Sequence, residues 1–302
     1  MVKAQKSSRR KMTKHEIGFH VFKYFIFITY GFLCFLPMWW MVINTTKTHA
    51  MINAQIDSFA TFLPSPDIST WLKSYVTLFT EFDLFGRAVF NSILYALIMI
   101  TCVLLVNSLA GYALARFKFP GGRFIETIII LLLIVPVETS VVTLYVILYK
   151  LNFLNTSTVL GPSLRIVAYI IPGVVSPFNI FLFRQYFLGI PKELEEAASI
   201  DGCSRLGTFF KIVFPLSLVI YATVTIFTFM GVWNDYLYPQ LIFTDERFFP
   251  VQVFLQQING RVPKDTSLVL ASLTFSTIPI VIVYVSFQKY IVEGVSYTGL
   301  KL

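Results

Sequence analysis

The sequence predicts an all-α integral membrane protein with six transmembrane helices and both termini in the cytoplasm. The first reason is composition: 56% of the 302 residues are apolar and only 13% are charged, whereas a soluble domain has about 25% charged residues. The second reason is the presence of six long apolar stretches, and the third is an uneven distribution of lysine and arginine between the loops. These features exclude a disordered chain, a coiled coil and a secreted disulfide scaffold.

The apolar stretches give the order of the spans. A transmembrane helix needs about 20 mostly apolar residues. We expect spans at residues 21–43, 90–115, 124–148, 166–187, 216–232 and 268–287. The chain then divides into a basic cytoplasmic tail (1–20), a six-helix transmembrane domain (21–290) and a cytoplasmic C-terminal tail (291–302). The first apolar run is too long for a signal peptide, so we interpret it as a retained span.

The lysines and arginines set the orientation of these spans. The N-terminal segment and the loops on its side of the membrane carry 16 of them, and the loops on the other side carry 8. Because positive charge collects in the cytoplasm, both termini are expected there. The net charge of +8 is therefore a topology signal, and no basic face is interleaved with stacking aromatic residues. We expect the lipid bilayer, and no nucleic acid, as a partner.

The first external loop, residues 44–88, contains a proline stop signal followed by an apolar helical pattern. Pro64 and Pro66 end one segment, and apolar residues then recur at helical spacing from Trp71 to Phe82. Two interpretations stay open. The helix lies on the membrane surface, or it packs on neighbouring helix ends.

The cytoplasmic loop between the fourth and fifth predicted spans is the most informative segment. Pro191 suits the first position of a helix. Glu193, Glu195 and Glu196 follow it, where the helix dipole favours anions. Gly202 suits the C-terminal cap. We expect a protruding helix of about three turns.

This helix has the character of a docking element. Leu194, Ala197 and Ala198 share one face, and the two alanines let another surface come close. A connector that lies on lipid headgroups is usually basic and bulky. This segment instead carries four carboxylates, with Asp201 near its tip.

The loop and several motifs outside it resemble those of a known family. Glu196-Ala197-Ala198, then Gly202, then Ile212-x-x-Pro215 are similar to the EAA loop of ABC importer permeases, here residues 189–215. The wider resemblance is to carbohydrate-uptake permeases of the maltose-permease G type, and it covers nearly the whole chain beyond the N-terminal tail. It is carried by residues 91–92, 113–120, 183–187, 233–236 and 287–290. Phe214, where the family more often has leucine, departs from the pattern.

The resemblance implies a type I ABC importer permease. The helix at residues 194–200 would be the coupling helix, seated in a cleft of a separate cytoplasmic ATPase dimer. Glu196 would pair with a basic group there, Gly202 would permit the turn, and Ala197, Ala198 and Asp201 would complete the ATPase-coupling surface. ATP and Mg²⁺ would be bound by the ATPase and no cofactor by this chain, since it lacks the Gly-x-x-x-x-Gly-Lys-Ser/Thr phosphate loop.

The resemblance implies further partners. They are a second, different permease subunit and a sugar-binding protein in the periplasm or outside the cell, with the complex in the bacterial cytoplasmic membrane. The loop at residues 236–267 would face the binding protein, and residues 293–302 would also touch the ATPase. The solute would be a sugar, with di- or oligosaccharides favoured, and a glycerol-phosphate-type ligand is the open alternative.

Two polar residues within spans are candidates for the translocation path. Glu138 lies near the middle of the third predicted span, where a carboxylate is costly and normally faces a cavity or a partner. Its alternatives are a structural hydrogen bond or a position nearer the membrane surface. Asn179 lies beside a break that Pro172, Gly173 and Pro177 make in the fourth span. Irregular backbone at that depth must pack on protein or line a wet cavity.

Three further candidates close the fifth span. Trp233, Asn234 and Asp235 combine an aromatic ring with an amide and a carboxylate, which suit stacking on a sugar and hydrogen bonding to its hydroxyls. An aromatic belt at the membrane interface explains Trp233 equally well.

Two other function classes have little support. An intramembrane enzyme needs a convergent catalytic set, but His15, His20 and His49 belong to no His-Glu-x-x-His motif and no Ser/His/Asp or Cys/His set converges. A secondary transporter usually needs several buried charges, and Glu138 is the clear case inside a span. The sequence therefore predicts a transport subunit without an ATPase site of its own.

Overall fold

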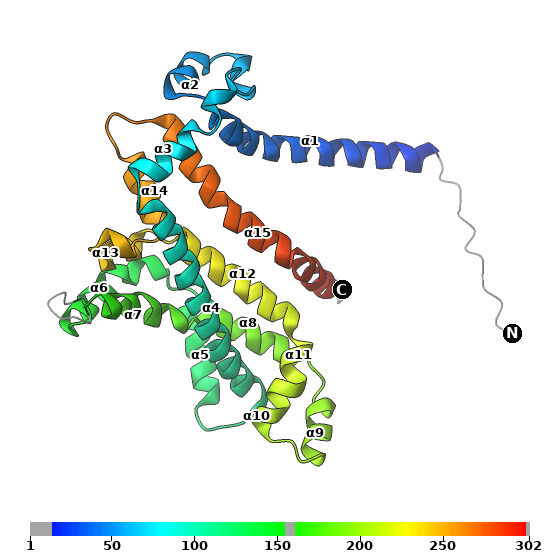
Figure 1. Cartoon of the computed structure of the whole chain (residues 1–302). Coiled ribbons are helices and arrows are strands. Elements are labelled where there is room, and N and C mark those ends of the chain that lie inside the picture. The colour runs from blue at the N-terminus through cyan, green and yellow to red at the C-terminus, as the bar shows by residue number, and fades with distance from the viewer. Residues whose placement is uncertain (1–13, 155–160, 300–302) are drawn as a thin grey trace. The chain divides into compact units, whose positions relative to one another are not determined.

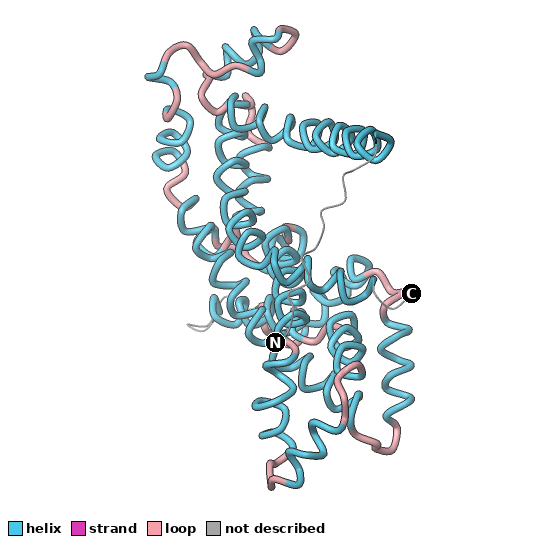
Figure 2. Tube along the Cα trace, turned by 90° about the vertical axis from the view of Figure 1, so that its right-hand side faces the viewer, coloured by secondary structure: helices cyan, strands magenta, loops and turns pink. Residues whose placement is uncertain are grey.

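A computed structural model describes residues 14–154 and 161–299. These residues form helices joined by turns and loops, without strands (Figure 2). The chain divides into two compact units, which we describe separately. The first contains Met1–Val76 and Asp265–Thr274, and the second contains Thr77–Lys264 and Phe275–Leu302.

The first unit is built on one long helix and a polar loop. α1 (Lys14–Asn44) confirms the first predicted span, and its apolar side chains are mostly exposed. The loop that follows contains α2 (His49–Gln55) and the 3₁₀ turns η1 (Phe59–Phe62) and η2 (Ile68–Thr70). Two buried side chains fix this loop. Asn44 donates to the Thr61 carbonyl at 3.0 Å, and Lys47 donates to the Ala60 carbonyl at 2.8 Å.

The predicted helix of the first long loop is observed as α3 (Lys73–Glu81). In its second half, Leu78 is fully buried, and the Phe79 ring contacts those of Phe85 and Phe275 at centroid distances of 5.6 and 5.2 Å. These contacts support the packed interpretation for this part of the helix. Leu72, just before the helix, is exposed.

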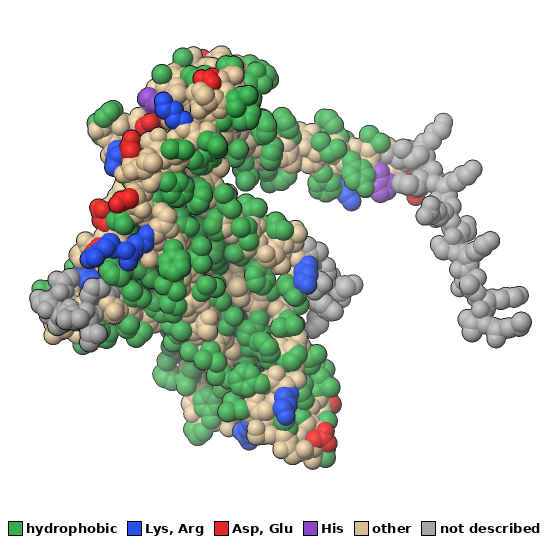
Figure 3. Space-filling model, in the orientation of Figure 1, with side chains coloured by type: hydrophobic (Ala, Val, Ile, Leu, Met, Phe, Trp, Pro, Cys, Tyr) green, Lys and Arg blue, Asp and Glu red, His purple; other side chains and the backbone are tan. Residues whose placement is uncertain are grey.

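The second unit is arranged around α4 (Phe85–Arg116), which contacts α7, α8, α12 and α14 (Figure 1). The remaining elements follow in chain order: α5 (Gly122–Leu132), η3 (Val137–Ser140), α6 (Val141–Lys150), α7 (Gly161–Val174), α8 (Pro177–Leu188), α9 (Glu193–Ile200), α10 (Arg205–Thr208), the π-helix η4 (Phe209–Val213), α11 (Phe214–Leu216), α12 (Leu218–Asn234), α13 (Leu237–Ile242), η5 (Glu246–Phe248) and α14 (Val251–Asn259). The last helix, α15 (Thr266–Gly299), begins in the first unit and continues in the second from Phe275. Hydrophobic side chains cover most of the visible face of this unit, and charged side chains gather mainly near α13 and α9 (Figure 3).

The described helices include several that suit a membrane. Three are long and apolar enough to cross one: Gly18–Asn44, Phe85–Arg116 and Thr266–Tyr290. Two bent pairs raise the number to five if each is one span: Ser163–Val174 with Pro177–Leu188, bent by 43°, and Arg205–Leu216 with Leu218–Asn234, bent by 80°. The described part of the chain is therefore an all-helical protein with three to five candidate spans.

The third predicted span is not one continuous helix. α5 ends at Leu132 and α6 begins at Val141, and the 3₁₀ turn η3 lies between them. Pro136 accounts for the interruption, because proline has no amide hydrogen and disfavours helical backbone in the residue before it. Glu138 lies in this turn and is exposed.

The fourth predicted span has its break at one of the expected prolines. α7 ends at Val174 and α8 begins at Pro177, with Ser176 as the N-cap. Pro172 and Gly173 both lie inside α7, so the prediction is confirmed at Pro177 and is wrong at Pro172 and Gly173. Proline is tolerated at the first position of a helix because that amide has no partner within the helix.

The two predicted tails are only partly described. α1 begins at Lys14, so the first 13 residues of the predicted 1–20 tail lie outside the described residues. α15 runs on to Gly299 beyond the predicted end of the sixth span at residue 287. The segment predicted as a C-terminal tail therefore begins as a continuation of this helix.

Candidate functional site

The predicted docking helix is present as α9, at the end of the second unit where α4 ends (Figure 1). It has 8 residues, or about two turns, so the predicted length of three turns is wrong. Pro191 lies before the helix, because Lys192 is the N-cap and its carbonyl accepts from the amides of Glu195 and Glu196 at 2.9 and 3.0 Å. The helix thus begins two residues later than the proline suggests.

The predicted C-terminal cap is confirmed. Gly202 has a φ of +78°, which favours glycine. The Gly202 amide donates to the Ser199 carbonyl at 3.1 Å, and the Cys203 amide donates to the Ala198 carbonyl at 2.9 Å. This pair of bonds is the Schellman motif that satisfies the last carbonyls of a helix.

The faces of α9 differ from the prediction in one respect. Ala198 is buried against its own chain, whereas Ala197 and Leu194 are exposed. The small-residue face is therefore divided between an inner side and an outer side. Glu196 and Asp201 are exposed together with Ala197, and these groups are free for an external surface.

The three glutamates of the first turn are not equivalent, which the sequence did not indicate. Glu195 accepts a hydrogen bond from Arg116 Nε at 2.5 Å and another from the Tyr112 hydroxyl at 2.8 Å. The side chains of Arg116 and Glu195 are only 5% and 15% exposed. Arg116 also donates from Nη2 to the Ile190 carbonyl at 2.7 Å. No spacing rule links Arg116 to a residue 79 positions later.

An open pocket of about 280 Å³ lies between the end of α4 and α9. Arg116 and Glu195 contribute to its lining, and Lys192, Glu196 and Arg205 add charged groups. The pocket therefore places both positive and negative side chains beside the exposed face of α9.

The segment after α9 leads into the fifth predicted span through an irregular turn. The π-helix η4 follows α10, and π-helical turns frequently mark functional sites. The buried hydroxyl of Ser217 donates to the Val213 carbonyl at 2.6 Å, where the chain bends by 80° into α12. Phe209 of η4 is buried, and its ring lies 5.0 Å from that of Tyr112. Tyr112 thus contacts both α9 and the start of this turn.

The two path candidates within spans occupy different environments. Glu138 is exposed in η3. Asn179 is buried in the first turn of α8, where its backbone amide donates to Ser176 Oγ at 3.3 Å. Among the described residues, no hydrogen bond joins either one to the group at residues 233–235.

The three path candidates at the end of α12 do not form one cluster. Trp233 is fully buried. Its ring stacks on that of Phe229, with 5.3 Å between the ring centroids, and its Nε1 donates to the Ser276 carbonyl at 3.2 Å. Asn234 is exposed and donates to the Met230 carbonyl within its own helix at 2.8 Å. In these positions Trp233 packs α12 on α15, and Asn234 caps a helical carbonyl.

Asp235 is the member of this group that faces other polar side chains. Its carboxylate accepts from the Tyr238 backbone amide at 3.4 Å, and the Tyr238 ring lies 5.9 Å, between centroids, from the ring of Tyr169. The Tyr238 hydroxyl donates to the Ala168 carbonyl at 2.9 Å. Asp235 thus lies in a tyrosine-rich contact between α7 and α13.

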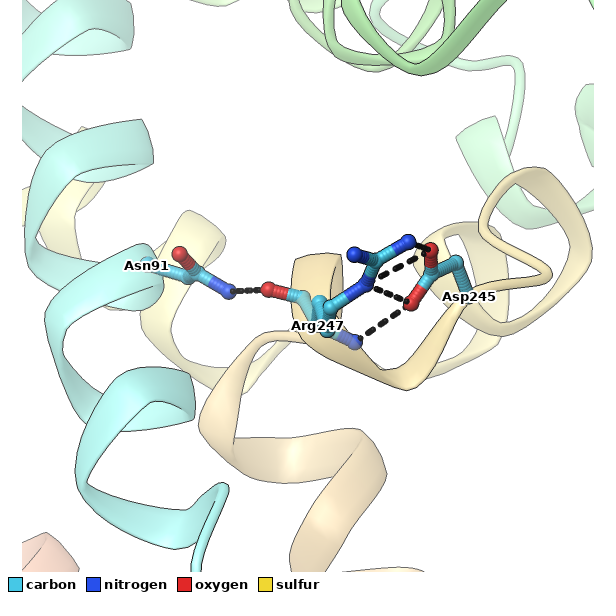
Figure 4. A network of polar contacts seen from close by, with 3 residues as sticks. All are labelled: Asn91, Asp245 and Arg247. Atoms are coloured by element: carbon cyan, nitrogen blue, oxygen red, sulfur yellow. Dashed lines mark hydrogen bonds and ion pairs between the residues drawn. The ribbon is translucent and has the colours of Figure 1, made fainter.

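The motif at residues 91–92 has a structural role that the sequence left unexplained. Asn91 donates to the Arg247 carbonyl at 2.9 Å (Figure 4). It also donates to the Phe249 carbonyl at 3.1 Å. The Ser92 hydroxyl accepts from the Val251 amide at 2.8 Å. One turn further along α4, the Tyr95 hydroxyl donates to the Phe248 carbonyl at 3.0 Å. The start of α4 therefore holds the backbone that joins η5 to α14.

An exposed ion pair lies on the same loop. Arg247 Nη2 is 2.6 Å from Asp245 Oδ2, and the Arg247 amide donates to Asp245 Oδ1 at 2.9 Å (Figure 4). These hydrogen bonds lower the pKa of the Asp245 carboxyl and raise the pKa of the Arg247 guanidinium. The pair lies in the same turn whose backbone Asn91 binds.

A further polar residue missed from the sequence is Asn107, which bridges the break in the fourth span. Its Nδ2 donates to the Val174 carbonyl at 2.7 Å, and its Oδ1 accepts from the Ser176 amide at 2.9 Å. Backbone groups left unpaired at a break in an apolar environment are costly. Asn107 satisfies two of them, and no local pattern links it to a break that lies 67 residues later in the chain.

The chain resembles known transport proteins over most of its length. It is 33% identical over 230 residues to the arabinooligosaccharides transport system permease protein AraQ of Halalkalibacterium halodurans, covering 76% of this chain and 79% of the relative. It is 31% identical over 283 residues to the trehalose/maltose transport system permease protein MalG of Thermococcus litoralis, covering 91% and 94%.

The fold also matches a solved structure, described as a bacterial ABC transporter involved in the import of the acidic polysaccharide alginate. The match has a TM-score of 0.76 at 21% identity and covers 93% of this chain and 99% of that one. Residues 107–297 match the family described as the binding-protein-dependent transport system inner membrane component. The protein is therefore a multi-pass protein of the cytoplasmic membrane and belongs to this family of ABC transporter permeases.

Proposed function

We propose that the chain is a permease subunit of an ATP-driven importer that moves a sugar, most specifically a di- or oligosaccharide, into the cytoplasm. The relatives named above for arabinooligosaccharides and for trehalose and maltose support this class of solute. The single observation that carries the coupling mechanism is the exposed Glu196 on α9, a short helix held firmly at both ends.

In this proposal α9 seats in a cleft of a separate ATPase dimer. Glu196 pairs with a basic group of the ATPase, and Ala197 and Asp201 complete the contact because they are exposed beside it. Gly202 and Ala198 act from within the chain, by capping α9 and by packing it. ATP and Mg²⁺ bind to the ATPase, and this chain contributes no active site. The displaced helix then biases the permease between its inward-open and outward-open states.

The assembly has further parts in this proposal. A second, different permease subunit completes the pore, and an external sugar-binding protein delivers the solute to the loop between α12 and α15. The chain crosses the membrane six times with both termini in the cytoplasm, and α5 with α6 forms the third crossing around the Pro136 break. The end of α15 also approaches the ATPase.

The translocation path is assigned to the polar groups that remain accessible. Glu138 and Asn234 are exposed, and Asp235 is partly exposed. Asn179 and Trp233 are buried, so in this proposal they support the wall of the path from behind.

The coupling contact is tested by Glu196→Lys in the complete transporter, with Glu193→Lys as the control. Both variants reverse one exposed charge in the first turn of α9, so both perturb the helix dipole alike. We expect Glu196→Lys to abolish sugar uptake while the complex still assembles. Glu193→Lys should keep most of the wild-type uptake. Normal sugar uptake by Glu196→Lys would refute the proposed contact between Glu196 and the ATPase.

A further inference from the structure

Adjacent glutamates on α9 have opposite environments. Glu196 is exposed, whereas Glu195 turns inward and is bound by two side chains of α4. If α9 serves to contact a partner, Glu195 cannot take part without breaking these bonds. Its role must therefore be internal to the chain.

Arg116 holds α9 at two points on either side of Pro191. Its Nη2 donates to the Ile190 carbonyl before the proline, and its Nε donates to Glu195 after it. The guanidinium is planar and presents donors in a fixed arrangement, so one arginine satisfies both acceptors, whereas a lysine is a single flexible point charge. The turn that enters α9 is thereby fixed to the last residue of α4.

Tyr112 extends the contact to the neighbouring elements. Its hydroxyl donates to Glu195, and its ring lies 6.0 Å from that of Phe187 at the end of α8 and 5.0 Å from that of Phe209 in η4. Phe187 and Phe209 are buried. Because the ion pair is also shielded from water, salt screens it much less than an exposed pair.

We propose that Arg116, with Tyr112, is a positioning residue that clamps the coupling helix to α4 through Glu195, so that α9 and α4 move as one body. This inference rests on the proposed seating of α9 in an ATPase, and it assigns the two glutamates separate tasks: Glu196 contacts the partner and Glu195 transmits the displacement. Since Asn91 and Ser92 hold the η5–α14 backbone at the other end of α4, the same helix connects both regions.

The first test measures the clamp itself. Hydrogen–deuterium exchange of residues 190–200 is compared in the full-length wild type, Arg116→Lys, Glu195→Gln and Arg184→Lys. Arg184 pairs with Glu126 at 2.8 Å and provides the matched control, because that pair joins α8 to α5. Losing a charge-assisted hydrogen bond should speed exchange in this segment about 10-fold in both clamp variants and leave it unchanged in Arg184→Lys. Wild-type exchange in both clamp variants would overturn the proposal.

The second test measures the use of the clamp in the complete transporter. Arg116→Lys and Glu195→Gln leave Glu196 unchanged, so the ATPase should stay bound. The sugar moved per ATP hydrolysed should fall about 5-fold or more, because coupling free energy between the two sites is lost. Normal stoichiometry in both would overturn the transmitting role. If Arg116→Lys does not assemble, Tyr112→Phe decides. This variant removes one hydroxyl and keeps the ring. We expect faster exchange of residues 190–200 and less sugar moved per ATP hydrolysed, both by smaller factors than in Arg116→Lys. Wild-type values of both quantities would contradict the clamp.

The outcomes separate this inference from the proposed function. A wild-type chain that binds no ATPase would refute the proposed function, and exchange of residues 190–200 would still measure the clamp. A wild-type complex that transports normally, together with clamp variants that also transport normally, would refute the transmitting role of the clamp and leave the proposed function standing.

Discussion

Gly111 in α4 lies directly against Phe183 in α8. A Cβ atom at position 111 would be 2.7 Å from Phe183 Cβ and 3.0 Å from the Arg184 amide nitrogen. Only glycine fits without a shift of the helices, and small residues at such contacts are what allow close approach in lipid. This contact is one residue from Tyr112, whose hydroxyl donates to Glu195 of α9, so the packing of α4 on α8 also positions that hydrogen bond.

We predict that Gly111→Val destabilises the permease by about 1–3 kcal/mol, because overpacking forces side chains and backbone apart. The measurement is thermal unfolding of the purified protein in detergent. Gly231→Ala is the control, since Gly231 lies within α12 with no atom near a new Cβ. It should be neutral or slightly stabilising because alanine favours helices. Equal losses in the two variants would contradict the proposed close contact.

We predict that Asn107→Ala destabilises the protein by about 1–3 kcal/mol, because it leaves the Val174 carbonyl and the Ser176 amide without their partner. The same unfolding measurement checks this. Thr101→Ala is the control on the same helix, because Thr101 is exposed and its hydroxyl donates within α4, to the Leu97 carbonyl. A loss of stability no larger than that of the control would mean that the Val174 carbonyl and the Ser176 amide find other hydrogen-bond partners.

We predict that Ser92→Ala loosens the start of α14. The buried Val251 amide loses its acceptor, which costs about 1–3 kcal/mol. Hydrogen exchange of residues 251–259 should become faster by the corresponding factor. Ser286→Ala is the matched control, because that exposed hydroxyl bonds only to the Ile282 carbonyl of its own helix. Unchanged exchange in Ser92→Ala would show that the loop is held without α4.

We predict that the Asp245–Arg247 pair is insensitive to pH between 5 and 8. Hydrogen bonds from Arg247 lower the pKa of Asp245 in the folded state, so the pair stabilises at pH values above the ordinary aspartate pKa of about 3.9. The stabilisation is lost as the pH falls through the lower, folded pKa. The check is the difference in unfolding temperature between wild type and Asp245→Asn. It should be small, because the pair is exposed, and constant across this range. A difference that changes between pH 5 and 8 would contradict the assignment.

The elements predicted most successfully are those whose signals lie within a few residues of one another. Gly202 ends α9 because only a residue that tolerates positive φ can form the cap, and that requirement is visible locally. Pro177 begins α8 for an equally local reason. Pro136 carries a similar signal, but the apolar run around it favoured one span and concealed the turn at η3.

The sequence by itself determined the membrane class, the positions of most apolar helices and the short acidic helix α9, because composition and periodicity differ between segments that face lipid and segments that face water. Only the tertiary structure decided which glutamate of α9 turns inward, that Trp233 is buried in packing, and that Asn91 and Asn107 hold backbone elsewhere. The physical reason is that these contacts join residues 43 to 156 positions apart. Such pairs form because packed helices bring them within hydrogen-bonding distance, and no pattern along the chain encodes that proximity.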